Sequence, residues 1–256
     1  MLTAMRRLWE VFLLLLATAF SKANGMKPNP NAMFNGRVES CRCLSWRVAV
    51  EANNVRAWPT VPAQCLEYIE TYMMQGQFEQ DVGMVVGQIA EYMKDLMPAA
   101  DGKDAWILDV DDTCLSNLIY YKGKRFGCDP YDPWAFKKWV QSRSCRAIPA
   151  VLELFRKLVD GGYKVFLLTG RDEETMGPPT IDNLHSRGFV GYERLILRSS
   201  TYKGQSAVRF KSEVRRQLAA EGYRIRGNVG DQWSDLVGDF AGDRTFKIPN
   251  PMYFVP

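Results

Sequence analysis

The sequence has a single histidine, His185, in 256 residues. Ser-His-Asp and Cys-His hydrolases need a catalytic histidine beside the nucleophile, and sites with two metal ions usually need several histidine ligands. The scarcity of histidine therefore argues against both classes of enzyme. His185 itself lies in a segment with helical character, and we expect it to be a surface residue near the end of a helix.

Long apolar runs and basic clusters are also scarce. The formal net charge is +4, with acidic and basic residues mixed along the chain. No basic stripe with interleaved aromatics indicates a nucleic-acid partner. One apolar run, residues 11–17, follows Arg6 and Arg7 and is too short to span a bilayer. No other stretch is long and apolar enough for a transmembrane helix.

The apolar run near the start predicts a signal peptide over residues 1–23. The small residues Ala17 and Ala19, or Ser21 and Ala23, fit a signal peptidase site, and we favour cleavage after Ala23. Cleavage there removes three basic residues and one acidic residue, which lowers the net charge to +2. We therefore expect the secretory pathway, an extracellular or vacuolar destination, and no membrane partner once the signal is removed.

Cysteine pairs with the spacing of a zinc site are absent, because no Cys-x-x-Cys occurs and histidine is scarce. All six cysteines lie beyond the predicted signal, and a secretory route permits disulfides. We predict a Cys43–Cys65 disulfide and take Cys128–Cys145 as a candidate second one, although sequence alone does not fix the connectivity. Cys114 has no obvious His or Lys partner, so we expect a buried thiol rather than a nucleophile.

The second half of the chain alternates extended and helical patterns. Strands are predicted at residues 105–108, 164–168, 194–197, 223–229 and 245–248, and helices at 151–158, 181–187, 206–220 and 232–237. This alternation implies an α/β fold with a doubly wound, mostly parallel sheet.

The region before the first strand, residues 24–104, is expected to be a helical N-terminal extension packed on the sheet. Residues 24–60 are rich in Asn, Pro and Gly and look irregular, whereas residues 62–74 and 78–96 carry helical signals. Within the remaining core, residues 105–256, an aromatic-rich segment at about 116–146 interrupts the alternation. We expect a small cap over the strand ends there, and simple hydrophobic packing is the alternative for most of its aromatics.

The sequence Asp109-Val-Asp-Asp-Thr113 directly follows the first predicted core strand. Ligands of parallel α/β sheets bind beyond the carboxyl ends of the strands. Because side chains alternate along extended backbone, Asp109 and Asp111 can project to the same side. Two such carboxylates can divide nucleophile and acid–base roles or hold a divalent metal. The alternative is an Asp-rich turn or helix cap without chemistry.

The second core strand is followed by Thr169-Gly-Arg171. A hydroxyl at a strand tip, followed by Gly170, can bind an anionic oxygen beside exposed backbone N–H groups. Taken alone, Thr169 and Gly170 are equally consistent with an ordinary strand-to-helix turn.

Lys211 lies on the predicted apolar face of a helix, together with Ala207, Val214 and Leu218. A lysine on a face that points at the sheet needs a partner, because burial of a lone ammonium is costly. We predict that Lys211 reaches a group of carboxylates and neutralises a bound anion. A lysine that extends to solvent from the edge of the face is the alternative, and Lys203, which precedes the helix, is a weaker candidate.

The strand at residues 223–229 leads into Gly230-Asp-Gln-Trp-Ser-Asp235. Asp231 lies at the strand tip and Asp235 one helical turn later, so both can face one point. Two more carboxylates at the same edge of the sheet favour a bound cation, and Mg²⁺ suits hard oxygen ligands. A helix cap with a solvent-facing aspartate is the alternative.

These four segments, in this order, resemble the haloacid dehalogenase superfamily of phosphotransferases. A closer resemblance to the plant acid phosphatase and vegetative storage protein family covers nearly all of the chain beyond residue 23. It is carried by these segments: Cys43-Leu-Ser-Trp-Arg47, Val50-Glu-Ala-Asn-Asn54, Asp111-Asp-Thr-Cys-Leu-Ser-Asn117, Leu167-Leu-Thr-Gly-Arg171, Gly230-Asp-Gln-Trp-Ser-Asp235 and Phe246-Lys-Ile-Pro-Asn-Pro-Met-Tyr253.

The resemblance implies a phosphatase of the class B-like acid phosphatase type, with residues 105–256 as its catalytic core. It implies that Asp109 attacks phosphorus, Asp111 is the general acid and base, and Thr169, Gly170 and Lys211 bind the phosphate. It also implies Mg²⁺ as the cofactor, with ligands from Asp109, Asp111, Asp231 and Asp235.

The expected partner is a small phosphomonoester, with no nucleic acid, and a homodimer is compatible with these expectations. Some storage relatives lack the nucleophilic aspartate, which this chain keeps as Asp109. The competing interpretation is a vegetative storage protein with little or no catalytic role. Phosphotransfer to an alcohol acceptor is a second enzymatic alternative that uses the same residues.

Overall fold

The computed structural model describes residues 30–256, with side chains from Ser40 onward. Residues 43–256 form one compact unit, to which the account below refers. The predicted signal peptide lies outside the described residues. Within residues 30–256, none of the helices has the length and apolar character needed to cross a membrane.

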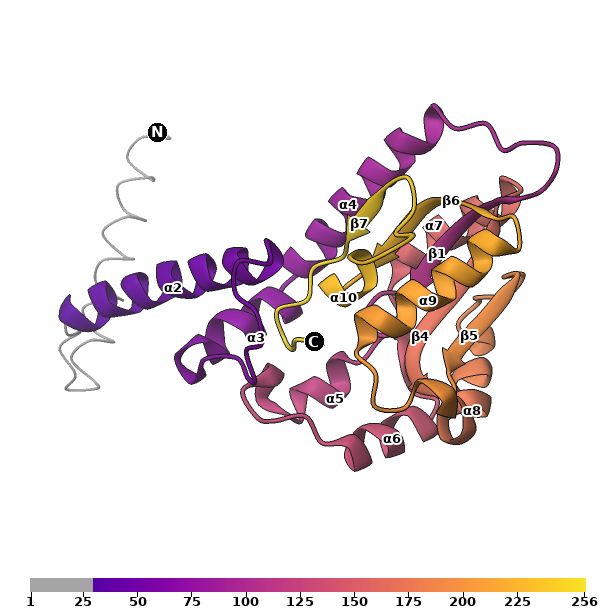
Figure 1. Cartoon of the computed structure of the whole chain (residues 1–256). Helices are drawn as coiled ribbons and strands as arrows, with labels where there is room; N and C mark the ends of the chain where they lie inside the picture. The colour runs from indigo at the N-terminus through magenta and orange to yellow at the C-terminus, as the bar shows by residue number, and fades with distance from the viewer. Residues whose placement is uncertain (1–29) are drawn as a thin grey trace, which may run out of the picture. The chain divides into compact units, whose positions relative to one another are not determined.

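The core is an α/β fold around a five-stranded, fully parallel sheet in the order β5-β4-β1-β6-β7 (Figure 1). The strands are β1 (Asp104–Asp109), β4 (Lys164–Asp172), β5 (Arg194–Arg198), β6 (Arg224–Gly230) and β7 (Thr245–Lys247). The fold class predicted from the sequence is therefore correct, and β1 is the central strand.

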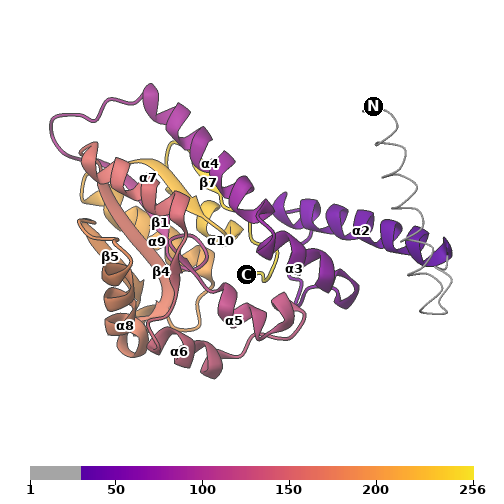
Figure 2. The same ribbon diagram turned by 180° about the vertical axis from the view of Figure 1, so that it is seen from behind.

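Helices cover both faces of this sheet. The α-helices of residues 30–256 are α2 (Pro30–Glu51), α3 (Leu66–Met74), α4 (Gln77–Lys94), α5 (Leu118–Lys122), α6 (Pro133–Gln141), α7 (Pro149–Asp160), α8 (Glu173–Ser186), α9 (Ala207–Ala220) and α10 (Trp233–Leu236), not all of which contact the sheet. Helix α9 crosses one face in Figure 1, and α7 and α4 cross the other face in Figure 2.

The burial of β1 follows from this double covering. All six of its residues are buried, and its side chains alternate between the two faces. Trp106 and Leu108 join the large core with α4 and α7, whereas Ala105 and Ile107 join the smaller core with Phe210 of α9. A strand buried on both faces reads as a continuous apolar run, which explains why the sequence signal was strong.

Helix α2 contradicts the prediction that residues 24–60 are irregular, because residues 30–51 are helical. Cys43, Trp46 and Val50 lie at helical spacing and pack into the core, although the Asn, Pro and Gly before them hide this pattern. The predicted Cys43–Cys65 disulfide is present and joins α2 to the turn before α3.

The candidate Cys128–Cys145 disulfide is wrong, since both residues carry unpaired thiols. The sulfur of Cys145 instead contacts polar side chains inside the fold, Asn117 at 3.6 Å and Arg171 at 3.8 Å. Cys114 is a buried thiol, as expected. Burial raises its pKa well above the usual value, which keeps the thiol protonated.

Helix α8 is longer than predicted, since it begins at Glu173 rather than near residue 181. Asp172 caps it by accepting a hydrogen bond from the N–H of Thr175 at 2.9 Å. His185, near the helix end, is exposed and lies 3.0 Å from the hydroxyl of Tyr192.

The aromatic-rich segment after β1 contains α5 and α6 and is closed by a two-stranded antiparallel ribbon. The ribbon pairs β2 (Leu115–Ser116) with β3 (Arg146–Ala147). Both helices lie on the side of the molecule where the parallel strands end (Figure 1). The role of this segment as a cap stays a prediction.

Candidate active site

The candidate site lies at the carboxyl edge of the sheet, where β1 ends at Asp109. Lys211 reaches it from the sheet-facing side of α9, and its Nζ donates to Asp109 and to Asp235 at 2.5 Å each. Lys211 is 4% exposed, so its ammonium is held by carboxylates rather than by water. The sequence-based prediction that Lys211 reaches a group of carboxylates is matched by this geometry.

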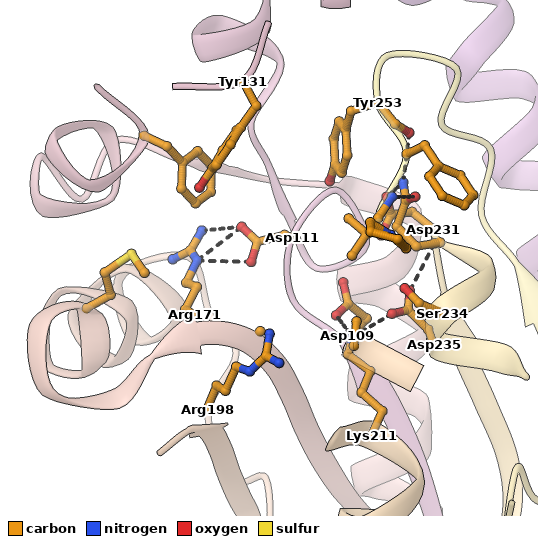
Figure 3. A pocket seen from close by; sticks show the side chains of 18 of the residues that line it. Asp109, Asp111, Tyr131, Arg171, Arg198, Lys211, Asp231, Ser234, Asp235 and Tyr253 are labelled. Carbon is orange, nitrogen blue, oxygen red and sulfur yellow. Dashed lines mark hydrogen bonds and ion pairs between the residues drawn. The ribbon is translucent and has the colours of Figure 1, made fainter. Parts of the chain in front are cut away.

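Three buried carboxylates converge here, from Asp109, Asp231 and Asp235, with ligand oxygens within 4.8 Å of one another (Figure 3). Asp231 directly follows β6, and Asp235 lies on α10. Gly230 permits the close approach, because a Cβ there would lie 2.5 Å from the Cβ of Asp235.

Amide groups fix two of these carboxylates. Asp231 accepts from Asn250 Nδ2 at 2.6 Å and from Gln232 Nε2 at 2.8 Å. Asp235 accepts from the backbone N–H of Gln232 at 2.9 Å, in a capping box that starts α10. The oxygens are thus oriented before any ligand arrives.

The electrostatics of this group favour a further cation. Burial, with repulsion among the carboxylates, raises the pKa of Asp109 well above its usual value, and Lys211 opposes the shift. Burial followed by repulsion from Asp235 raises the pKa of Asp231 to about 6. Three carboxylates face one ammonium, so a divalent ion between them would restore charge balance.

The hydroxyl of Ser234 supplies a second sign that a ligand belongs here. Ser234 is 3% exposed and lines the cavity, yet its Oγ has no hydrogen-bond partner in the described structure. Buried polar atoms are nearly always paired. A hydrated cation or an anionic oxygen in the cavity would pair this hydroxyl, so the donor set fits Mg²⁺ with an oxyanion.

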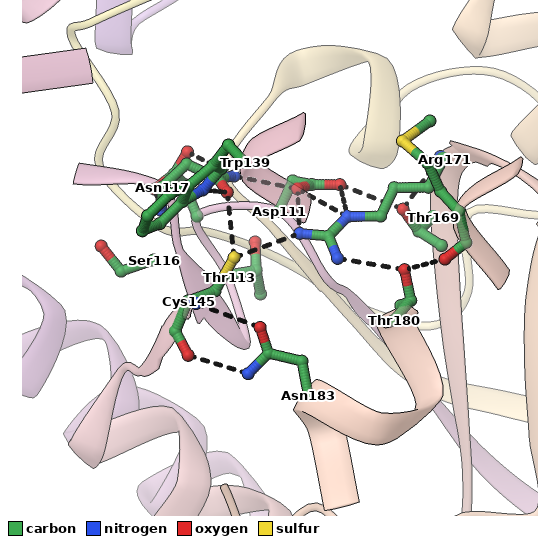
Figure 4. A network of polar contacts seen from close by, with 12 residues as sticks. Asp111, Thr113, Ser116, Asn117, Trp139, Cys145, Thr169, Arg171, Thr180 and Asn183 are labelled. Carbon is green, nitrogen blue, oxygen red and sulfur yellow. Dashed lines mark hydrogen bonds and ion pairs between the residues drawn. The ribbon is translucent and has the colours of Figure 1, made fainter. Parts of the chain in front are cut away.

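Asp111 lies on the other side of the cavity and has a different set of partners (Figure 4). The Nη2 and Nε of Arg171 donate to its Oδ1 at 2.8 and 3.0 Å, Thr169 Oγ1 donates at 3.1 Å, and Asn117 Nδ2 donates at 2.9 Å. Burial raises the pKa of Asp111, but the charge of Arg171 and the hydrogen bonds from Arg171, Asn117 and Thr169 together outweigh it, so the pKa lies below the usual value.

The structure brings the predicted residues to the lining of one cavity, except Thr169, which is fully buried, and it does not bring them to one point. Asp109, Lys211, Asp231 and Asp235 form one group, and Thr169 hydrogen-bonds Asp111 in a second group. Gly170 is exposed at the cavity wall.

Sequence reasoning missed Arg171, Asn117 and Tyr253 as site residues. Tyr253 donates from its hydroxyl to Asp112 at 2.9 Å, and Asp112 also accepts from the N–H of Asn117 at 2.7 Å. Each lies in a segment that the sequence had already singled out, which was the signal that could have found it. Nothing in the sequence placed the C-terminal segment next to Asp112.

The cavity has a volume of 410 Å³ and lies between the two groups (Figure 3). Its other walls include Tyr121, Tyr131 and Phe136 from the aromatic segment and the last residues of the chain, 253–256. The rings of Tyr121 and Tyr253 stack with centroids 4.7 Å apart. The cavity is thus wider than a phosphoryl group and largely aromatic on one side.

This arrangement, an aspartate at the end of the central parallel strand opposite a lysine and an acidic pair, defines a phosphatase of the haloacid dehalogenase (HAD) type. The family model described as HAD superfamily, subfamily IIIB (acid phosphatase), matches residues 32–256. The chain belongs to this family of acid phosphatases, as the sequence resemblance predicted.

Several plant proteins are similar to this chain over most of its length. Acid phosphatase 1 of Solanum lycopersicum is 42% identical over 217 residues, which cover 85% of each chain. The stem 31 kDa glycoprotein of Glycine max is 37% identical over 87% of each chain. Vegetative storage protein 2 of Arabidopsis thaliana is 36% identical over 86% of this chain and 82% of its own.

Among solved structures, the class C acid phosphatase of Bacillus anthracis has a similar fold. The TM-score is 0.61 at 21% identity, with 75% of this chain and 85% of that chain covered. The identity is low, so this likeness concerns the fold alone.

Proposed function

We propose that the protein is a Mg²⁺-dependent acid phosphatase that hydrolyses small phosphomonoesters through an aspartyl-phosphate on Asp109. The observation that carries the proposal is a buried ion pair at the end of the central strand. Lys211 Nζ lies 2.5 Å from Asp109 Oδ1, and both side chains are buried. A carboxylate beside a fixed ammonium can attack phosphorus while the ammonium stabilises the phosphoryl oxygens.

In the first step a carboxylate oxygen of Asp109 forms a bond to phosphorus while the bond from phosphorus to the leaving oxygen breaks. Asp111 gives its proton to that leaving oxygen. Arg171 holds the pKa of Asp111 below its usual value, which favours the ionised form that the second step requires and restricts the protonated form to acidic solution. In the second step ionised Asp111 takes a proton from water, and the hydroxide oxygen displaces Asp109 from phosphorus.

The residues proposed to hold Mg²⁺ are Asp109, Asp231 and Asp235 through their carboxylates, and Asp111 through its backbone carbonyl. When bound, the ion would offset the negative charge of carboxylates and phosphate and so allow an anionic substrate to approach. Lys211 and Thr169 bind the transferring phosphoryl oxygens, with Gly170 beside them. Asn250 and Gln232 keep the carboxylate of Asp231 oriented.

The test is hydrolysis of phenyl phosphate by wild type and by Asp109→Asn, each with Mg²⁺ and with chelator. We expect Mg²⁺-dependent turnover in wild type and a loss of roughly 10⁴-fold in the variant, because a nucleophile is removed. Circular dichroism checks that the variant is folded. Equal rates for the two proteins would contradict the mechanism, and a full rate in chelator would contradict the metal requirement.

A storage role is the second candidate, because relatives 36% and 37% identical to this chain are named vegetative storage proteins. The intact constellation around Asp109 favours catalysis, but a storage protein could retain it. Folded, Mg²⁺-loaded wild type without turnover on any aryl phosphate would favour storage. Phosphotransfer to alcohols is distinguished from hydrolysis by adding glycerol to the assay. Glycerol phosphate among the products indicates transfer to the alcohol, and free phosphate indicates hydrolysis.

We also infer passage through the secretory pathway to an extracellular or vacuolar site. The apolar run at residues 11–17 and the Cys43–Cys65 disulfide support this, because disulfides persist in oxidising compartments. N-terminal sequencing of the protein from its natural source tests it, with cleavage after Ala23 expected. A mature chain that begins at Met1 would contradict the inference.

A further inference from the structure

Three cationic side chains line the cavity, and two of them are neutralised. Lys211 pairs with Asp109 and Asp235, and Arg171 pairs with Asp111. The third cation, Arg198, is the last residue of β5 and has no ion pair within the described part of the chain. Figure 3 shows its guanidinium directed toward the space between Asp111 and Asp109.

The guanidinium of Arg198 is fixed by neutral groups. Its Nε donates to the carbonyl of Tyr202 at 3.3 Å, and its Nη2 donates to the carbonyl of Gln205. Its central carbon lies 5.6 Å from the centroid of the Phe210 ring. These contacts orient the planar group without cancelling its charge, and Nη1 makes no hydrogen bond in residues 30–256. A pre-oriented and unpaired guanidinium is suited to bind an anion.

The cavity leaves room for such an anion in addition to the phosphoryl group. With phosphorus at Asp109, the rest of the 410 Å³ volume must hold the leaving group. Tyr131 and Phe136 from the aromatic segment form one wall of this volume, and Arg198 lies on another. A leaving group with an apolar body and a charged end matches both walls.

We propose that Arg198 is a specificity-determining residue that binds a second anionic group on the leaving group of the phosphomonoester. The proposal rests on the proposed phosphatase function, because it assumes that the scissile phosphate lies at Asp109. It predicts that the preferred substrates carry two separated anionic groups, the scissile phosphate and a group that pairs with Arg198.

The test compares phenyl phosphates that carry a carboxylate or a neutral carboxamide at the same ring position, meta or para. The two groups have nearly the same shape and differ in charge. We expect wild-type kcat/KM to be about tenfold higher for the carboxylate at one or both positions, as for one charge-assisted hydrogen bond. In Arg198→Gln the ratio should fall to within about twofold of unity.

Arg209→Gln is the matched control, because Arg209 is an exposed cation on α9 outside the cavity lining. It removes the same charge at a distance and should keep the preference for the carboxylate. The proposal is overturned if wild type shows no preference at either position, or if Arg198→Gln loses equal activity on both esters. Equal losses would place Arg198 on the scissile phosphate instead.

A binding measurement separates this proposal from the phosphatase function. Calorimetric titration with benzylphosphonate bearing either a carboxylate or a carboxamide reports the same preference without turnover. The second anion site is supported, even when hydrolysis is absent, if wild type binds the carboxylate-bearing phosphonate about tenfold more tightly than the carboxamide and Arg198→Gln does not. If hydrolysis occurs and the binding preference is absent, the phosphatase stands and the anion site is refuted.

Discussion

The two sides of the cavity both contain buried carboxylates, but these carboxylates have different partners. On the Asp109 side, three carboxylates share the single ammonium of Lys211. On the Asp111 side, one carboxylate has the guanidinium of Arg171 to itself and accepts from neutral groups as well. The first side has one positive charge for three carboxylates, whereas the second side is balanced by its own residues. In the proposed mechanism, metal binding and proton transfer are thus separated in space.

Replacement of one acid on each side gives the largest expected effect. Asp111→Asn should lower kcat/KM by roughly 10³-fold, because the proton-transfer group is lost. Its affinity for Mg²⁺ should change little, because its carboxylate faces Arg171. Asp231→Asn should weaken Mg²⁺ binding by at least about tenfold. Steady-state kinetics measure kcat/KM and calorimetry measures Mg²⁺ affinity for both variants. A large loss of Mg²⁺ affinity in Asp111→Asn would contradict the assignment of metal binding to the Asp109 side alone.

Replacement of Arg171 tests whether its ion pair with Asp111 contributes to stability. Arg171→Met should lower the free energy of unfolding by about 3 kcal/mol, because a buried ion pair loses one partner. Arg143→Met is the control, since its ion pair with Asp182 is exposed and should contribute less than about 1 kcal/mol. Urea unfolding measures both, and similar losses in the two variants would contradict the prediction.

The unbalanced side should make stability depend on pH and on metal together. In chelator, the raised pKa of Asp231, about 6, gives stability that is present below pH 4 and is lost as pH rises through 6. Saturating Mg²⁺ should add about 2–3 kcal/mol at pH 7.5 and almost nothing at pH 4. Thermal unfolding at both pH values checks this, and an equal gain at both would refute it.

The smallest expected effect concerns Cys128, which forms no disulfide with Cys145. The sulfur of Cys145 contacts Arg171 and Asn117 instead. Because no covalent link is lost, Cys128→Ala should change the free energy of unfolding by less than about 0.5 kcal/mol. Cys43→Ala is the reference, because loss of the Cys43–Cys65 disulfide should cost about 3 kcal/mol. A loss of similar size in Cys128→Ala would show that the Asp111 side needs a covalent link.

The sequence predicted the parts of the site that depend on local pattern. The residues of β1 before Asp109 are apolar on both faces, and Asp231 directly follows β6, so the positions of these two aspartates follow from the sheet topology. Lys211 was predictable because a charge on an apolar helical face needs a partner. The parallel sheet followed from the alternation of strand and helix patterns.

The missed features depend on contacts between distant segments. Arg171 could equally have extended into solvent, and only the packed structure pairs it with Asp111. Helix α2 was missed because the Asn, Pro and Gly residues before Cys43, Trp46 and Val50 hide the helical spacing of these three core residues. Cys128 and Cys145 were only a candidate pair, since sequence does not fix connectivity, and the sulfur of Cys145 instead contacts Asn117 and Arg171.

Residues 250–256 carry a consequence for how the site can be perturbed. Asn250 and Tyr253 hydrogen-bond Asp231 and Asp112, and Pro256 lines the cavity. These residues therefore complete a site that begins at Asp109, more than 100 residues earlier in the sequence. A change confined to residues 253–256, far from Asp109 in sequence, would remove part of the cavity wall without touching any of the four site carboxylates.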